Sequence, residues 1–98
     1  MKISPGDVVV AILHLPRERL LGIADQIDQA GLSLRSIDLS YFDEWCASIA
    51  EGEPHLRMSD NFFPMWRVER VTRDEAADGV ATLAEQFEKR TGMRLEHQ

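Results

Sequence analysis

The residues that could do chemistry in this chain are one cysteine, three histidines and a few pairs of carboxylates. A cysteine becomes a nucleophile when a histidine or a helix N-terminus lowers its pKa. Cys46 instead lies in the middle of a predicted helix, beside Trp45 on the apolar side, which predicts a packed, unreactive thiol. His14, His55 and His97 share no metal-ligand spacing with one another or with Cys46. We therefore predict no catalytic residues, no metal site and no cofactor.

Acidic residues occur in adjacent or closely spaced pairs, and such pairs can perform general acid–base chemistry. The sequence places them on solvent faces or in the first turn of a helix, where carboxylates are usually solvated or stabilise the helix end. The pairs are Asp25 with Asp28, Asp43 with Glu44, and Asp74 with Glu75. Gly-rich phosphate loops, paired-cysteine motifs and a Ser-His-Asp motif do not occur in the sequence. The chain is therefore predicted not to be an enzyme.

Composition restricts the class of partner. The 98 residues carry a net charge of −6, and the densest basic stretch, residues 67–73, is interrupted by Glu69. Binding to nucleic acid requires a concentrated basic face, so direct nucleic-acid binding is not expected. The longest apolar run is far below the roughly 20 residues that span a bilayer, and no signal-peptide cleavage site follows it. We expect a single domain, residues 1–98, without membrane contact, in the cytoplasm.

The elements that must position these side chains begin with the apolar run at residues 8–13. Its lack of alternation predicts a strand buried on both faces, in the centre of a sheet. Ser4 followed by Pro5 also fits a helix start over residues 5–14, but three consecutive valines favour the strand. Apolar spacing predicts a helix over residues 17–30, ended by a left-handed Gly31. A second strand over residues 32–39 changes parity near Arg35, which predicts a bulge there.

The second half of the chain supplies three more elements. A short helix over residues 41–51, capped by Ser40 and Asp43, is followed by a polar loop up to residue 61. A strand is predicted over residues 63–71, a helix from a Thr72–Glu75 capping box to Gly92, and a last strand over residues 93–96. Without the short helix, this order is the split strand–helix–strand pattern of a ferredoxin-like α+β fold, with two helices covering an antiparallel sheet.

Residues 20–24 and 30–39, which read as a helix, an Ala-Gly pair and an apolar strand, resemble the first helix and second strand of ACT domains. ACT domains are small regulatory modules of ferredoxin-like fold that often bind amino acids. The resemblance implies a small-molecule site in the turn after the first strand, at His14, Leu15, Pro16 and Arg17. ACT ligand sites typically have a Pro-Gly pair in this turn, whereas here Arg17 follows Pro16.

Aromatic residues gather in and around the inserted helix and the strand that follows it. Tryptophan, tyrosine and arginine are enriched where proteins bind one another. The residues predicted to bind a protein partner are Tyr41, Trp45, Phe63, Trp66 and Arg67. The prediction is therefore a non-enzymatic regulatory or inhibitory module that binds a larger protein machine, with an ACT-type amino-acid sensor as the alternative. Free sheet edges in such a domain also predict a possible homodimer.

Overall fold

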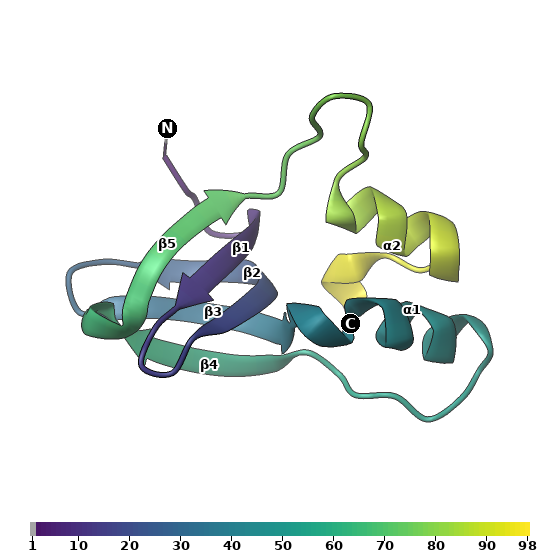
Figure 1. The fold of residues 1–98 in the computed structure, drawn as a ribbon, viewed down its shortest axis with the longest axis horizontal. Coiled ribbons are helices and arrows are strands. Elements are labelled where there is room, and N and C mark those ends of the chain that lie inside the picture. The colour runs from purple at the N-terminus through teal and green to yellow at the C-terminus, as the bar shows by residue number, and fades with distance from the viewer. Residues whose placement is uncertain (1) are drawn as a thin grey trace.

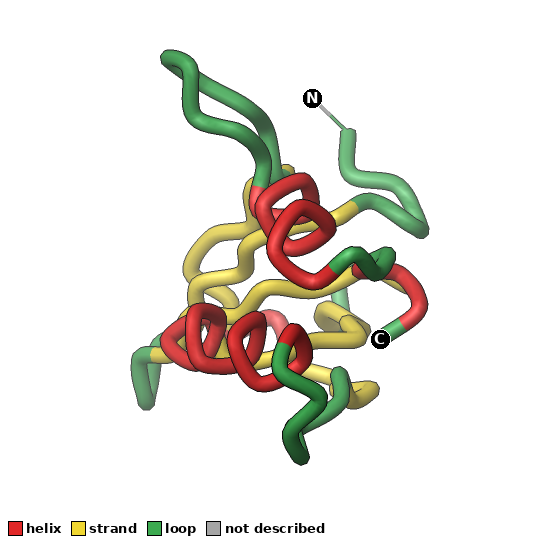
Figure 2. Tube along the Cα trace, turned by 90° about the vertical axis from the view of Figure 1, so that its right-hand side faces the viewer, coloured by secondary structure: helices red, strands yellow, loops and turns green. Residues whose placement is uncertain are grey.

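A computed structural model describes residues 2–98 of the protein, which form one antiparallel sheet and two helices (Figure 1). The sheet has five strands in the order β4-β3-β2-β1-β5. The helices α1 and α2 lie side by side against the sheet, as the turned view in Figure 2 shows. The strands are β1 (Val8–Leu13), β2 (Glu18–Ile27), β3 (Gly31–Asp38), β4 (Ser59–Pro64) and β5 (Val68–Arg73). The helices are α1 (Phe42–Ala50) and α2 (Leu83–Thr91), with single 3₁₀ turns η1 (Leu39–Tyr41), η2 (Met65–Arg67) and η3 (Leu95–His97).

The first apolar run forms strand β1, as the three valines predicted. It pairs with β2 on one side and β5 on the other, so it lies inside the sheet. Val9, Ala11 and Leu13 are completely buried on one face, while Val8 and Val10 pack toward the helices on the other. The prediction of a central strand with two covered faces is therefore confirmed, and the helical alternative for residues 5–14 is wrong.

The helix expected over residues 17–30 is wrong, because this segment forms β2, the longest strand. Leu20 and Ala24 belong to one face of the sheet, Leu21 and Ile23 to the other, so residues 20–24 lie between two cores, while residues 25–27 are exposed. The pairing with β3 shifts register between Ala24 and Gln26, and this bulge moves the later side chains to a spacing that resembles a helix. Pairing on both sides of β2 supplies hydrogen bonds that outweigh the weak local helix preference.

The bulge expected in β3 near Arg35 is also absent from that strand, which pairs with β4 without a register shift. The apolar side chains of β3 change from even to odd positions because Leu32 and Leu34 face one core while Ile37 faces the other. Gly31 does not end a helix or adopt a left-handed conformation. It opens β3, where an added Cβ would lie 2.2 Å from the carbonyl oxygen of Phe63.

The short inserted helix is confirmed as α1, with the buried side formed by Phe42, Trp45, Cys46 and Ile49. Its capping differs from the expectation. The Asp38 carboxylate accepts a hydrogen bond from the Ser40 amide and so caps η1, and no side chain caps α1. The Ser40 hydroxyl also donates to this carboxylate, and the bonds from the hydroxyl and the amide of Ser40 lower the pKa of Asp38.

The predicted strand over residues 63–71 is divided by η2 into β4 and β5, which lie at opposite edges of the sheet. Helix α2 begins ten residues later than expected, because residues 74–82 form an exposed loop in which Asp78 and Gly79 have positive φ. Its capping box is Thr82 with Glu85, and Gly92 ends it in the left-handed conformation, as predicted. The expected last strand is instead η3, whose Leu95 inserts into the core.

The fold class, α+β with an antiparallel sheet and two helices, is confirmed. The order of strands in the sheet, β4-β3-β2-β1-β5, differs from the ferredoxin-like expectation. In addition, β1 is followed along the chain by β2, without the helix that was expected between them.

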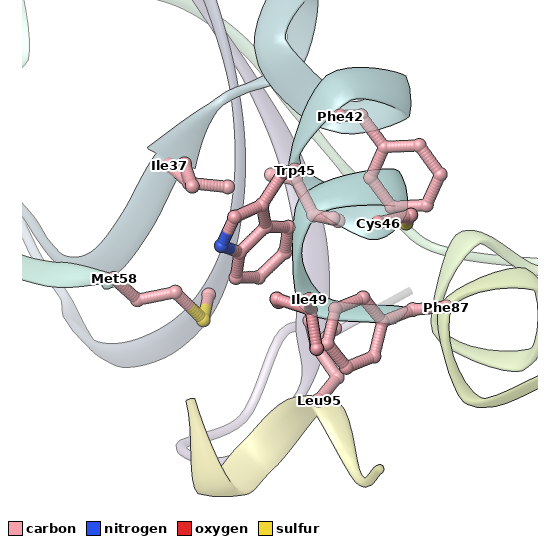
Figure 3. Close-up of a cluster of buried hydrophobic side chains, with 9 residues drawn as sticks. Ile37, Phe42, Trp45, Cys46, Ile49, Met58, Phe87 and Leu95 are labelled. Atoms are coloured by element: carbon pink, nitrogen blue, oxygen red, sulfur yellow. The ribbon is translucent and has the colours of Figure 1, made fainter. Parts of the chain in front are cut away.

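Two hydrophobic cores lie on opposite faces of the sheet. The first holds α1, α2 and η3 against β2 and β3, and Figure 3 shows Trp45 at its centre between Ile37, Met58 and Ile49. The Trp45 and Phe87 rings join the two helices, with centroids 4.8 Å apart. The second core is formed by the sheet itself, with side chains from all five strands. It contains Val9, Ala11, Leu13, Leu20, Ala24, Leu32 and Leu34, with Phe63, Val68 and Val71 packed against them.

Candidate protein-binding surface

The structure brings the turn between β1 and β2 against the 3₁₀ turn η2. These two segments are about 50 residues apart in sequence, and together they carry most of the residues predicted to bind a ligand or a partner. We call this the hairpin surface, defined by His14, Leu15, Pro16, Arg17, Trp66 and Arg67. The two separate predictions, a partner site and an alternative small-molecule site, therefore meet in one place.

Arg67 holds the hairpin surface together. Its guanidinium donates hydrogen bonds to the carbonyl oxygens of His14 (3.2 Å) and Pro16 (2.9 Å). It also forms an ion pair with Glu18 at 2.8 Å, and its side chain is only 17% exposed. The Phe63 ring lies beneath the guanidinium, with 5.9 Å between the ring centroid and Cζ. Charge-assisted bonds of this kind are stronger than neutral ones, so Arg67 fixes the turn rather than presenting a free charge.

Backbone groups also join the β1–β2 turn to η2. The His14 amide donates to the Arg67 carbonyl at 2.9 Å, which extends the ladder between β1 and β5. The His14 ring nitrogen Nε2 contacts the Trp66 carbonyl, and because a carbonyl can only accept, the imidazole donates this bond. Both segments are thus positioned by bonds that do not involve the side chains of Leu15 and Trp66.

Leu15 and Trp66 are left to face solvent. Leu15 is 72% exposed and Trp66 is 64% exposed, the two highest values among the large apolar side chains of residues 2–98. Leu15 also has φ of 57°, a left-handed conformation that costs a non-glycine residue about 1–2 kcal/mol. Around them, Arg17 pairs with Glu69 at 3.5 Å on the exposed rim. An apolar centre with a mixed-charge rim is the usual anatomy of a protein interface.

Three residues of the predicted partner set are not part of the hairpin surface. Phe63 is half-buried beneath Arg67 and packs against the second core. Trp45 is completely buried, and its indole Nε1 donates to the Leu56 carbonyl at 2.8 Å, so it is not available to a partner. The prediction that Trp45 binds a partner is therefore wrong, and Trp45 is a core residue. Tyr41 is half-buried and packs against that same core from η1. Apolar spacing on α1 had already marked Trp45 as buried, whereas enrichment of tryptophan at interfaces pointed the other way.

A hollow of about 690 Å³ lies over β2, β3 and β4, next to the first core, since Ile23 lines the hollow and also packs against that core. Its polar lining includes Arg35, Asp25 and Asp60, and Ile23 and Phe62 supply apolar walls. None of its lining residues belongs to the predicted site residues. The signal for it in the sequence is the Phe62-Phe63 pair, because neighbouring residues of a strand point to opposite faces of the sheet, so the two rings cannot both pack against the second core.

Cys46 is buried in the first core, as the sequence predicted. Burial raises the pKa of its thiol, which keeps it protonated and weakly nucleophilic near neutral pH. We expect a thiol reagent to modify Cys46 in the native protein only at the rate of unfolding, and at once in denaturant. Rapid stoichiometric labelling of the folded protein, followed by mass spectrometry, would contradict this.

Among residues 2–98, no group of three His, Cys, Asp or Glu side chains is arranged to hold a metal ion. Neither helix in this part of the chain has the length and apolar character to cross a membrane. Comparison of the chain with models of protein families, with curated proteins and with solved structures finds no match. A function for this chain must therefore be inferred from the site itself.

Proposed function

We propose that this protein is a non-enzymatic module that binds another protein and regulates or inhibits it as part of a larger assembly. The observation that carries the proposal is the hairpin surface, where Leu15 and Trp66 are 72% and 64% exposed on segments that hydrogen bonds hold in place. An exposed apolar pair of this kind fits a complementary protein surface better than it fits a small molecule, because small molecules usually bind in concave pockets.

The chemistry of the surface supports this function. Tryptophan contributes large binding energies when it fills a pocket on a partner, and arginine often accompanies it. The bonds from Arg67 to His14 and Pro16 order the turn before a partner arrives. Binding then loses less conformational entropy than it would with a mobile loop. The matching feature of the partner is an apolar pocket for Trp66, with polar groups around it.

The test compares affinity capture by tagged wild-type protein with capture by Trp66→Ala. The matched control is Met93→Ala, which removes another exposed apolar side chain (49% exposed) beyond α2. If Trp66 is central, its removal weakens binding by about 30-fold or more, corresponding to a loss of about 2 kcal/mol. We expect one protein to be retained by wild type and Met93→Ala and lost by Trp66→Ala. Equal retention by all three would contradict the proposal.

A thermal-unfolding titration separates this function from amino-acid sensing, which the ACT-type resemblance implied. A ligand at 100 times its dissociation constant stabilises a protein by about 2.7 kcal/mol. We expect amino acids to leave Tm unchanged, and a specific rise that Arg17→Ala abolishes would favour the sensor instead. Residues 20–24, which the resemblance takes as a helix, lie in strand β2.

A further inference from the structure

We propose that strand β4 is a self-association edge, at which two copies of this chain pair antiparallel about a two-fold axis through Phe62. The occupant of the edge is therefore a second copy of the chain. This proposal is independent of the hairpin surface, because no residue of the hairpin surface belongs to β4.

The pattern of hydrogen bonds between β3 and β4 shows which backbone N–H and C=O groups of β4 are not bonded to β3. Met65 donates its amide to the Ala30 carbonyl at 3.0 Å, and these two residues continue the register in which Gly31 faces Pro64. In an antiparallel pair the bonded positions alternate, so Phe63 and Asn61 also bond toward β3. The N–H and C=O groups of Asp60 and Phe62 consequently point away from the sheet, along its free edge.

Pro64 fits this assignment, because it stands at an outward-pointing position where its missing N–H leaves no ladder bond unmade. In Figure 1, β4 runs along the outer margin of the sheet, and no helix is drawn beyond it. Residues 59–62 are all exposed. The edge therefore offers the outward donors of Asp60 and Phe62, together with the carbonyl oxygens of those two residues and of Pro64.

The two edge strands, β4 and β5, differ in how well they are protected against pairing with another chain. Natural sheets guard their free edges with charged side chains, bulges or covering elements. Three of the six residues of β5 are charged, namely Glu69, Arg70 and Arg73, and its pairing with β1 contains a register shift. Strand β4 carries one charge, Asp60, and pairs with β3 without a shift. It also presents Phe62, whose side chain is 57% exposed. The unguarded edge is therefore β4.

The sequence of β4 complements itself in one register. With the two-fold axis at Phe62, the two Phe62 residues exchange N–H···O=C bonds, and each Asp60 amide donates to the Pro64 carbonyl of the other copy. Because Pro64 has no N–H, the return hydrogen bond from Pro64 to the Asp60 carbonyl of the other copy is missing from each strand. No hydrogen bond within the monomer is lost. Both Phe62 rings then lie across from each other on the same face, where aromatic pairs stabilise a sheet. Each Asp60 faces Pro64, so like charges do not meet.

The experiment measures the mass of the wild-type protein by sedimentation equilibrium from micromolar to millimolar concentration. We expect the average mass to rise toward twice that of the 11.2 kDa chain. Phe62→Lys places two ammonium groups opposite each other at the axis and should abolish the rise. Val80→Lys is the matched control, because it adds the same charge at a 60% exposed apolar residue in the loop before α2, and should dimerise as wild type does.

Amide hydrogen exchange of the wild-type protein tests the register without any substitution. The Asp60 and Phe62 amides should exchange rapidly when dilute and become protected as the protein is concentrated, whereas the Asn61 and Phe63 amides should be protected throughout. A protein that stays monomeric at every concentration overturns the proposal. So does a dimer that survives Phe62→Lys, or one that leaves the Asp60 and Phe62 amides unprotected.

Discussion

Trp45→Ala should lower the free energy of unfolding by about 3–5 kcal/mol, the range measured when large aromatic side chains are removed from cores. Trp45 is completely buried, stacks on Phe87 and lies between α1 and the sheet. Alanine leaves a cavity that the surrounding side chains fill only in part. It also deprives the Leu56 carbonyl of its hydrogen bond from the indole, which ties the loop before β4 to α1.

The measurement is urea denaturation together with thermal unfolding. A domain of this size loses about 4–8 °C of Tm for each kcal/mol, so Tm should fall by at least about 12 °C. Trp66→Ala is the matched control, because it removes the same side chain from a 64% exposed site, and it should change stability by no more than about 0.5 kcal/mol. Comparable losses in the two variants would show that Trp45 is not the core residue described here.

Gly31→Ala should destabilise the protein by about 1–3 kcal/mol or more through overpacking, although it adds only one methyl group. The added Cβ would lie 2.2 Å from the Phe63 carbonyl oxygen and 2.7 Å from Cζ of the Phe62 ring. The ring could rotate away, but the carbonyl is part of the β3–β4 ladder and cannot move without loss of pairing. Strand β4 must therefore separate from β3 at this point.

Ser33→Ala supplies the comparison, since Ser33 lies two positions further along β3, opposite Phe62, and loses only its hydroxyl group. We expect this variant to stay within about 0.5 kcal/mol of the wild type in urea denaturation. Amide exchange should also report faster opening of β4 in Gly31→Ala alone. If Gly31→Ala were as stable as Ser33→Ala, β4 would not approach β3 as closely as the structure requires.

The local features that sequence analysis recognised correctly are those whose physical cause lies within a few residues. The unbroken run of β1 predicted two buried faces, and the spacing on α1 predicted its buried side. Gly92 marked the end of α2. Each follows from the left-handed freedom of glycine or the period of side chains along an element.

The failure at residues 17–30 has an equally physical cause. Leu20, Ile23, Ala24 and Ile27 have helical spacing, but a bulged strand with two buried faces produces the same spacing. Gly22 was the local signal against the helix, since glycine destabilises a helix interior and in a strand often marks a close approach of backbones. Here an added Cβ would lie 2.6 Å from the Arg35 carbonyl oxygen.

The sequence by itself therefore determined which side chains of β1 and α1 are buried, that α2 ends at Gly92 and that Cys46 is a packed thiol. The tertiary structure alone decided that residues 18–27 form a strand, because a strand obtains its hydrogen bonds from neighbours that no local pattern identifies. It also decided between core and interface for the aromatic residues predicted to bind a partner, of which Trp45 is buried and Trp66 faces solvent. It also assembled the hairpin surface, since the partners that Arg67 needs, His14 and Glu18, lie 53 and 49 residues away in the chain and meet it only when β5 pairs with β1.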